Sequence, residues 1–310
     1  MFLVCGEALM DVFSGAETPT GMLLDARVGG SPFNVAVGLA RLAQPVWFFG
    51  AISQGFLGQR LMQALTLEGV ATTTVVRTHA PTTLSLVGVD AAGVPSYAFY
   101  GEGGAERRLV PDALALLPAG LQAIHVGSYA CVVEPVAATL RALVERERTQ
   151  TLIAYDPNIR LTVESDTARW REALEWMLPR IHLLKISDED LALLQPDTPA
   201  PQFAAAALAR GVKLVVLTRG SEGAQAWSAQ GEVQVPPVPV TLADTVGAGD
   251  SFQAALLCWL AENACLSIAA LAALTLPQLQ HALQFASRAA ALTCSRRGAD
   301  LPRRAELRPH

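Results

Sequence analysis

The chain has 310 residues, of which 51% are apolar and 16% charged, and its net charge is −5 at pH 7. So many apolar residues exclude a disordered chain, and the length suits one large α/β domain or two small ones. The negative charge argues against a general nucleic-acid surface. Five cysteines without C-x-x-C spacing predict reduced thiols in a cytoplasmic protein, and five isolated histidines predict no zinc site.

A short apolar strand is predicted at the N-terminus, over residues 2–5. It is followed by Glu7 and Asp11, and it lacks the basic start of a signal peptide. Because ligands of open α/β sheets lie beyond the carboxyl ends of strands, Asp11 is a candidate ligand group. A surface acid in a hairpin explains Asp11 equally well. Residues 14–28 look like a loop, because they contain glycine and proline.

A pair of glycines precedes the first predicted helix. Gly29 and Gly30 allow close approach of the backbone to a ligand. Ser31 fits the N-cap position, and Pro32 fits the first helical position. Asn34 is a poor helix former, but it can point a donor and an acceptor at a ligand. An ordinary glycine turn with a cap is the structural alternative.

The next part of the chain predicts a small sheet. Strands are expected at 46–51 and 73–77, with a helix at 57–68 between them. Residues 83–89 and 96–100 alternate as a β-hairpin would, with its turn at Ala92-Gly93. This hairpin is predicted to form a sheet with residues 12–28 that acts as a lid. The edges of such a sheet often pair, which favours a homodimer.

From about residue 110 onward, short apolar strands alternate with helices. The strands are expected at 123–126, 151–155, 181–185 and 214–218, and the helices at 135–147, 167–178, 188–194 and 200–210. This alternation predicts a parallel sheet with helices on both faces. Without a change in composition that would mark a linker, residues 1–310 are predicted to form a single domain. Two further buried helices are expected near 250–263 and 266–274, and their polar interruptions argue against a membrane span.

Polar residues follow three of these strands, at 155–160, 185–190 and 218–223. The carboxyl ends of parallel strands meet at one rim of a sheet. The sequence therefore predicts a phosphate-binding rim with Arg160, backbone amides and acidic groups for a metal. Simple N-capping of the next helix is the alternative for residues 187–190.

The segment Asp244–Phe252 is predicted to be a loop that becomes the start of a helix. Gly247 and Gly249 let the backbone turn tightly, and the free N–H groups of a first helical turn attract anions. Asp250 is explained if a phosphate lies on these amides and the carboxylate takes a proton from an attacking hydroxyl. An ordinary helix cap is again the alternative.

Two of these stretches, residues 29–36 and 244–252, resemble the two signatures of the ribokinase-like (PfkB) family of carbohydrate kinases. Residues 286–302 resemble the C-terminal end of the same family. The resemblance implies a doubly wound, mostly parallel α/β sheet with helices on both faces, and a small β-sheet lid formed by about 12–28 and 83–105. It also implies ATP and Mg²⁺ as cofactors, with K⁺ in some members.

The resemblance also implies roles for individual residues. The catalytic group is Asp250 as base, with Gly247, Ala248 and Gly249 as the anion hole. The substrate-binding group is Asp11, Gly30, Asn34, Tyr100 and Arg160. The nucleotide-binding group is Lys185, Thr218, Gly220 and Gly223. The metal group is Asp190, which would hold Mg²⁺ through water, and Asp244, near the monovalent-cation position of some members.

Departures from the family pattern bear on the substrate and the metal. Asp190 stands in place of Glu and Ser187 in place of Asn, which predicts weaker or shifted metal binding. Ser31 stands where phosphosugar kinases usually carry Lys, which argues against a phosphorylated substrate. Residues 6–11 and 156–160 look most like bacterial fructokinases and 2-keto-3-deoxygluconate kinases. We expect an ATP-dependent kinase acting on a primary hydroxyl of a small sugar, with fructose first. The alternatives are 2-keto-3-deoxygluconate, a pentose or a nucleoside as substrate, and a catalytically idle sugar-binding regulator.

Overall fold

The computed structural model describes residues 1–89 and 95–307, and its centre is an eight-stranded sheet. The strand order is β14-β13-β12-β11-β10-β9-β1-β4. The strands are β1 Phe2–Cys5, β4 Val46–Phe49, β9 Ala123–Gly127, β10 Leu152–Asp156, β11 Leu183–Ser187, β12 Leu214–Thr218, β13 Ala224–Ser228 and β14 Gly231–Val235. All neighbouring pairs from β4 to β12 are parallel, while β13 and β14 add an antiparallel edge. The predicted mostly parallel sheet is confirmed.

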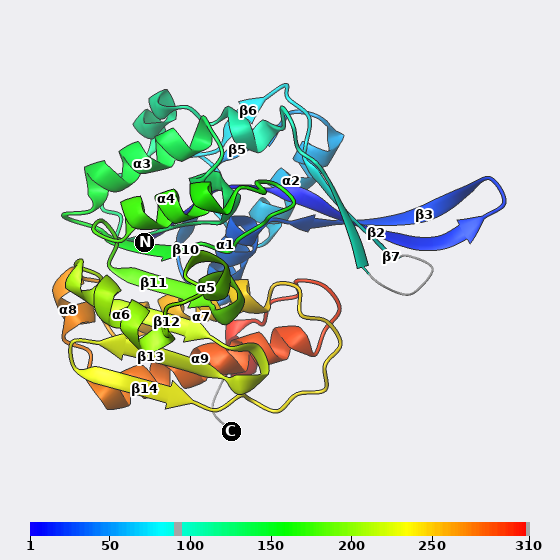
Figure 1. The fold of residues 1–310 in the computed structure, drawn as a ribbon. Helices are drawn as coiled ribbons and strands as arrows, with labels where there is room; N and C mark the ends of the chain where they lie inside the picture. The colour runs from blue at the N-terminus through cyan, green and yellow to red at the C-terminus, as the bar shows by residue number, and fades with distance from the viewer. Residues whose placement is uncertain (90–94, 308–310) are drawn as a thin grey trace.

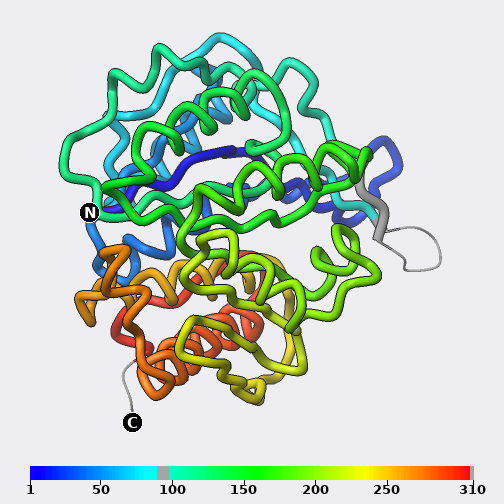
Figure 2. Tube along the Cα trace, turned by 60° about the vertical axis from the view of Figure 1, so that its left-hand side comes forward, coloured from blue at the N-terminus to red at the C-terminus, as the bar shows by residue number. Residues whose placement is uncertain are grey.

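Helices cover both faces of this sheet, as the alternating pattern predicted (Figure 1). One face carries α3 Val136–Glu147, α4 Thr167–Met177, α5 Asp188–Leu194 and α6 Ala200–Ala209. The other carries α1 Ser31–Arg41, α2 Phe56–Leu67, α7 Ala248–Glu262, α8 Ile268–Ala272 and α9 Leu276–Cys294. Successive residues of a strand point to opposite faces, so Leu3 and Cys5 join one apolar core while Phe2 and Val4 join the other. Figure 2 shows the dark blue trace of β1 running through the interior of the body.

A second sheet of four strands projects from this body (Figure 1). Its order is β3-β2-β7-β8, with β2 Leu9–Thr18, β3 Gly21–Gly29, β7 Leu84–Val89 and β8 Pro95–Tyr100. The small separate sheet is confirmed, and its action as a lid stays a prediction. The turn predicted at Ala92-Gly93 lies outside the described residues.

The interpretation of residues 14–28 as a loop was wrong, because they lie in the long hairpin β2–β3. Most of this hairpin is exposed on both faces, so no alternation of buried and exposed residues marks it as strand. A register shift between Ser14 and Glu17 breaks the period of two as well. The predicted strand 46–51 is likewise divided into β4 and β5 Ala51–Ser53, and β5 pairs with β6 Val76–Thr78.

Short 3₁₀ turns complete the fold at Ala105–Arg108, Pro111–Leu116, Ser128–Cys131, Gly220–Glu222 and Arg304–Leu307. Among the described residues, no helix has the length and apolar character needed to cross a membrane. The apolar helix α7 packs instead along α9 and α1. This packing places the start of α7 beside the start of α1, where the two sequence signatures lie.

Candidate active site

Asp250 lies in the first turn of α7 and is buried, although it is a carboxylate. Its two oxygens accept hydrogen bonds from residues of α1. Ser31 Oγ donates to Oδ1 at 2.6 Å, and Asn34 Nδ2 donates to Oδ2 at 2.8 Å. Two segments more than 200 residues apart in sequence therefore meet at one carboxylate. Burial raises the pKa of Asp250, while the two hydrogen bonds oppose this rise.

The start of α1 differs from the prediction in one respect. Gly30 occupies the N-cap position, with φ 106° and ψ 131°, and Ser31 is the first helical residue. The Ser31 hydroxyl is therefore bonded to Asp250 instead of to an amide of its own helix. A hydroxyl bonded to a charged oxygen forms a stronger hydrogen bond than one bonded to a neutral partner, and this accounts for the preference. Ser31 thus joins the candidate site, which the capping interpretation had missed.

The loop before Asp250 presents free amides, although the amide of Ala248, a predicted member of the anion hole, donates to the Thr245 carbonyl oxygen at 3.2 Å. Gly247 has φ 78°, a left-handed conformation, and a Cβ on it would lie 2.7 Å from the Cβ of Ala299. The N–H groups of Gly249 and Asp250 donate to no oxygen in the described part of the chain. Free amides at the N-terminus of a fifteen-residue helix attract an anion. The loop therefore has the geometry expected of an anion hole.

The charge of the exposed Arg160 acts on three carboxyl groups, those of Glu7, Asp11 and Asp250. Asp11 lies near the start of β2, and Glu7 lies just beyond β1. Burial raises the pKa of Glu7 to about 8 and that of Asp11 to about 6, while the Arg160 charge lowers both. Burial therefore makes Glu7 and Asp11 hold their protons more tightly than free carboxyl groups do, and the charge of Asp250 adds a smaller effect.

Asp11 and Glu7 also pack against the glycine pair before α1. A Cβ on Gly29 would lie 2.1 Å from Asp11 Oδ2, and a Cβ on Gly30 would lie 2.8 Å from the Glu7 carbonyl oxygen. The glycines therefore leave the space that the two acids occupy. The structure brings Asp11, Gly30 and Asn34 together as predicted, although Asp11 comes from within a strand and not from beyond its end.

Lys185 and Asp156 form a buried ion pair on the rim of the main sheet. Lys185 Nζ lies 2.6 Å from Asp156 Oδ2, and both side chains are almost fully buried. The same Nζ lies 3.1 Å from the place that a Cβ on Gly249 would take. The predicted nucleotide group Lys185 therefore lies directly beside the predicted anion hole.

The predicted metal residue Asp190 lies near this ion pair, in the first turn of α5. Its Oδ1 accepts the Ile159 amide at 3.1 Å, and burial together with the charge of Asp156 raises the pKa of Asp190 to about 6. Ser187 caps α5 by accepting the Asp190 amide, so the capping interpretation holds for Ser187.

The oxygens on this rim fit Mg²⁺ only as a partly hydrated ion. Asp156 Oδ1 is buried without a hydrogen-bond partner in the described part of the chain, which leaves it available to a metal or its water. No cluster of three metal-binding side chains occurs in residues 1–89 and 95–307. Mg²⁺ commonly uses one or two carboxylates together with waters and substrate phosphates, so Asp156 and Asp190 suffice.

The predicted nucleotide residues Thr218, Gly220 and Gly223 lie together at the turn from β12 to β13. Gly220 and Gly223 have φ 47° and 90°, and a Cβ on Gly223 would lie 2.2 Å from the Val235 carbonyl oxygen. The Arg219 amide donates to the Gly223 carbonyl at 2.9 Å and closes the turn. The described residues contain no hydrogen bond between this turn and Asp250.

Two other predicted residues lie at the edges of this arrangement. Tyr100 is exposed at the end of β8 in the small sheet. Asp244 accepts the Val246 amide at 3.1 Å and the Gly298 amide at 2.8 Å, so it ties the anion-hole loop to the C-terminal segment. Glu7 and Asp156 were missed as site residues, although the strand-end rule that selected Asp11 applies to both.

A buried carboxylate beside free helix amides, with an ammonium group next to them, is the arrangement of a phosphoryl-transfer enzyme. A model of the pfkB family of carbohydrate kinases matches residues 3–305, and the chain belongs to this family.

Relatives and solved structures agree with this assignment. The chain is 37% identical over 259 residues to a fructokinase of Rhizobium leguminosarum bv. trifolii, covering 83% of this chain and 78% of that protein. It is 30% identical over 302 residues to probable fructokinase-4 of Arabidopsis thaliana, covering 95% and 90%. The Vibrio cholerae O395 fructokinase structure with fructose, ADP and calcium has a TM-score of 0.82 at 26% identity, over 99% and 97% of the chains. The ATP-bound fructokinase of Xylella fastidiosa, at 24% identity, has a TM-score of 0.88 over 99% and 96% and supports the fold.

Proposed function

We propose that this protein is an ATP-dependent fructokinase that transfers the γ-phosphate of ATP to a primary hydroxyl of fructose. The position of Asp250 carries the proposal, because its carboxylate lies between the polar start of α1 and the free amides of α7. The fructokinases among the relatives support fructose as the sugar. The structure of the Vibrio cholerae fructokinase with fructose and ADP supports it as well.

In the proposed reaction, Asp250 is the general base. The sugar is held by Asp11, Gly30 and Asn34, so that a primary hydroxyl replaces one of the hydrogen bonds that Asp250 now accepts. As the hydroxyl oxygen forms its bond to the γ-phosphorus, its proton passes to Asp250 and the bond to the β-phosphate oxygen breaks, releasing ADP. Burial raises the pKa of Asp250, which makes its carboxylate a stronger base than a free aspartate.

The charge on the transferred group is balanced by the anion hole. The free amides of Gly249 and Asp250 face the γ-phosphate in this proposal, with Gly247 shaping the loop, and Lys185 adds a positive charge beside Gly249. Asp190 and Asp156 would hold Mg²⁺ through water, and the ion would supply further positive charge to the ATP phosphates. Asp244 holds the loop near a K⁺ site, while Thr218, Gly220 and Gly223 form the nucleotide turn.

The four-stranded sheet acts as a lid over the sugar in this proposal, with residues 12–28 and 83–105 as its parts and Tyr100 facing the substrate. Its edge strand β3 exposes Met22, Leu23 and Leu24, which supports pairing of two copies through the lid. Sedimentation of the wild type and of Leu23→Glu tests the homodimer. A wild-type monomer would exclude it.

A coupled assay of ADP release tests the proposed function, with Mg²⁺ and ATP and a panel of possible acceptors. The panel contains fructose, ribose, 2-keto-3-deoxygluconate, adenosine and fructose 6-phosphate. We expect strong turnover on fructose, a fall in kcat of about 10³-fold with Asp250→Asn, and loss of turnover without Mg²⁺. Parallel assays in K⁺ and Na⁺ test the monovalent cation. Equal turnover in K⁺ and in Na⁺ would exclude a specific requirement for K⁺.

A sugar acid is the second candidate, because Arg160 donates only to the carbonyl oxygen of Ile159 among the described residues and is free to bind a carboxylate. Turnover on 2-keto-3-deoxygluconate alone would replace fructose by that acid and keep the mechanism. No turnover on any acceptor, with ATP still bound, would contradict the proposed function and favour an idle sugar-binding regulator.

A further inference from the structure

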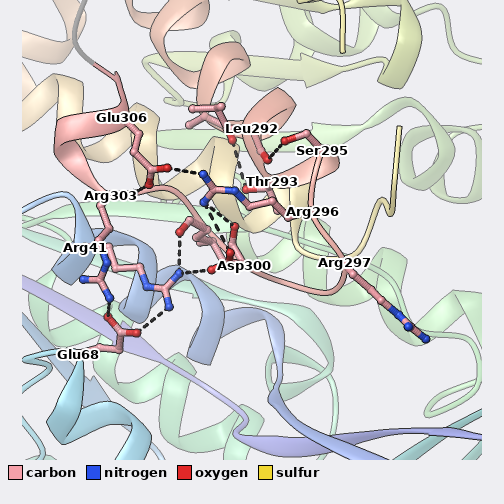
Figure 3. Close-up of polar contacts among 12 residues, drawn as sticks. Arg41, Glu68, Leu292, Thr293, Ser295, Arg296, Arg297, Asp300, Arg303 and Glu306 are labelled. Carbon is pink, nitrogen blue, oxygen red and sulfur yellow. Dashed lines mark hydrogen bonds and ion pairs between the residues drawn. The ribbon is translucent and has the colours of Figure 1, made fainter. Parts of the chain in front are cut away.

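The C-terminal segment Arg296–Leu301 is held against the body by a cluster of ion pairs (Figure 3). Arg41 of α1 donates to Asp300 Oδ1 at 2.7 Å and to the Leu301 carbonyl at 2.6 Å. Arg296 pairs with Asp300 and Glu306, while Arg41 also pairs with Glu68 at the end of α2. The segment is therefore fixed on the side that faces α1 and α2.

The same segment supports the anion-hole loop. The Gly298 amide donates to Asp244 Oδ2 at 2.8 Å, and Ala299 fills the space where Gly247 would carry a Cβ. Gly247 is the N-cap of α7, so its position sets the direction of the first helical amides. A shift of residues 298–299 would therefore move the proposed phosphate site.

One side chain of the small sheet reaches this segment. Arg27 lies near the end of β3, and its Nη1 donates a hydrogen bond to the Arg297 carbonyl oxygen at 3.2 Å. The same Nη1 lies 2.8 Å from the place that a Cβ on Gly298 would take, so the guanidinium lies against the backbone of Arg297 and Gly298. Figure 3 shows the Arg297 side chain pointing away from the ion-pair cluster. The contact with Arg27 is made by the backbone carbonyl of Arg297, and the Arg297 guanidinium takes no part in it.

The sheet holds this guanidinium from two sides. Arg27 Nε and Nη2 donate to Asp25 Oδ2 at 2.9 and 2.7 Å, and the guanidinium carbon lies 5.8 Å from the centre of the Phe13 ring. Phe13 and Asp25 are paired residues on β2 and β3. A movement of this sheet would therefore be transmitted to residues 297–298 by a short and oriented group.

We propose that Arg27 is a positioning residue that couples sugar binding under the small sheet to the affinity of the anion hole for the ATP phosphates. The inference rests on the proposed function, in which this sheet closes over the sugar. With the sheet closed, Arg27 holds residues 297–298, and through Asp244 and Gly247 it fixes the free amides for phosphate. A coupling free energy between two sites is reciprocal, so ATP tightens sugar binding by the same factor.

A simple surface ion pair is the competing explanation of Arg27. The pair with Asp25 is largely exposed, and exposed pairs contribute little to stability. If that pair were the purpose of Arg27, removing either partner would have the same effect. The bond to the Arg297 carbonyl predicts instead that loss of Arg27 has a much larger effect than loss of Asp25, because the β3 backbone and the Phe13 ring still place the guanidinium.

Titration calorimetry with a non-hydrolysable ATP analogue tests this coupling, with and without saturating fructose. We expect fructose to lower the Kd of the analogue about tenfold in the wild type, which is within the usual range of coupled sites. In Arg27→Met the same ratio should fall to about twofold or less, while the Kd without fructose stays within about twofold of wild type. The matched control Asp25→Ala keeps Arg27 and should retain most of the wild-type ratio.

A second variant guards against a trivial loss of folding. Gly298→Ala keeps Arg27 but places a Cβ 2.8 Å from its Nη1, at a residue whose φ of 75° also disfavours alanine, and it should lose coupling as Arg27→Met does. A wild type without coupling, or an Arg27→Met variant with the full ratio, would overturn the proposal. A failure of the proposed function gives a different result, because fructose would then neither bind to the protein nor cause it to release ADP from ATP.

Discussion

The two ends of the candidate site are built in different ways. At the catalytic end, Asp250 is buried and already accepts hydrogen bonds from Ser31 and Asn34. At the nucleotide end, Gly220 and Gly223 form a half-exposed turn that is closed by its own backbone. The catalytic end thus holds a carboxylate through hydrogen bonds from other side chains, whereas the nucleotide end offers a backbone shape.

This difference has an energetic consequence. Burial raises the pKa of Glu7 and Asp11, so the catalytic end holds carboxyl groups in surroundings that disfavour their charged forms. The residues predicted at the nucleotide turn, Thr218, Gly220 and Gly223, carry no titratable side chain. The contrast therefore predicts that substitutions at the catalytic end change chemistry and pH dependence, while substitutions at the turn change nucleotide binding alone.

Asp250→Asn should give the largest effect, because it removes the proposed base with almost no change in shape. We expect kcat to fall by about 10³-fold, within the range of general-base catalysis, while the Kd for ATP stays within about threefold. Steady-state kinetics and calorimetry measure the two quantities. Ser31→Ala is the matched control, since it removes one hydrogen bond but leaves the carboxylate, and it should lower kcat only about tenfold. Near-normal turnover of Asp250→Asn would contradict the assignment of the base.

The sequence predicted the fold well between residues 110 and 218, where short strands and helices alternate. Helices α3 to α6 match their predicted bounds within one residue, because their apolar faces repeat at helical spacing against the sheet. Residues 12–28 were predicted to join the small sheet, but their strands β2 and β3 were not recognised, and neither was β14, since all three are largely exposed. The buried strand β13 and the long helix α9 were not predicted either, although both have a buried face. A pattern of burial can predict only those elements that have a buried side.

The sequence predicted the candidate site through local motifs, and it missed the groups that act across long separations. Asn34 and Asp250 were selected because glycine turns precede both. The bond from Ser31 to Asp250 was missed, because serine before a helix is explained equally well by capping. Glu7 was passed over although it follows a strand end, since only the fold shows that Gly30 packs upon it.

Glu7→Gln tests the contrast between the two ends of the site through the pH dependence of the free energy of unfolding. In the folded protein burial raises the pKa of Glu7 to about 8, so it keeps its proton up to that pH, while in the unfolded chain it loses the proton above its ordinary pKa of 4.5. Between these values the unfolded chain binds fewer protons, so the stability of the wild type falls as pH rises. Relative to Glu7→Gln, we expect the free energy of unfolding of the wild type to fall by roughly 2–4 kcal/mol from pH 5 to pH 8.

Urea unfolding of both proteins at the two pH values measures this difference. Glu172→Gln, at an exposed position of α4, serves as the control and should show the same change with pH as the wild type. If Glu7→Gln and the wild type lost stability in parallel between pH 5 and pH 8, the carboxyl of Glu7 would not be the proton-holding group that its burial indicates.

Gly220→Ala should give the smallest effect and tests the nucleotide end directly. A Cβ on Gly220 meets no atom within 4 Å, so the only cost is the left-handed backbone at φ 47°, about 1 kcal/mol. We expect the KM for ATP to rise less than about fivefold, which corresponds to that cost, with kcat unchanged. Gly223→Ala is the matched comparison, since its Cβ would lie 2.2 Å from the Val235 carbonyl oxygen and would deform the turn. Its KM for ATP should rise further. If Gly220→Ala lowered kcat as strongly as Ser31→Ala does, the turn would take part in the chemistry, and the separation of the two ends would be wrong.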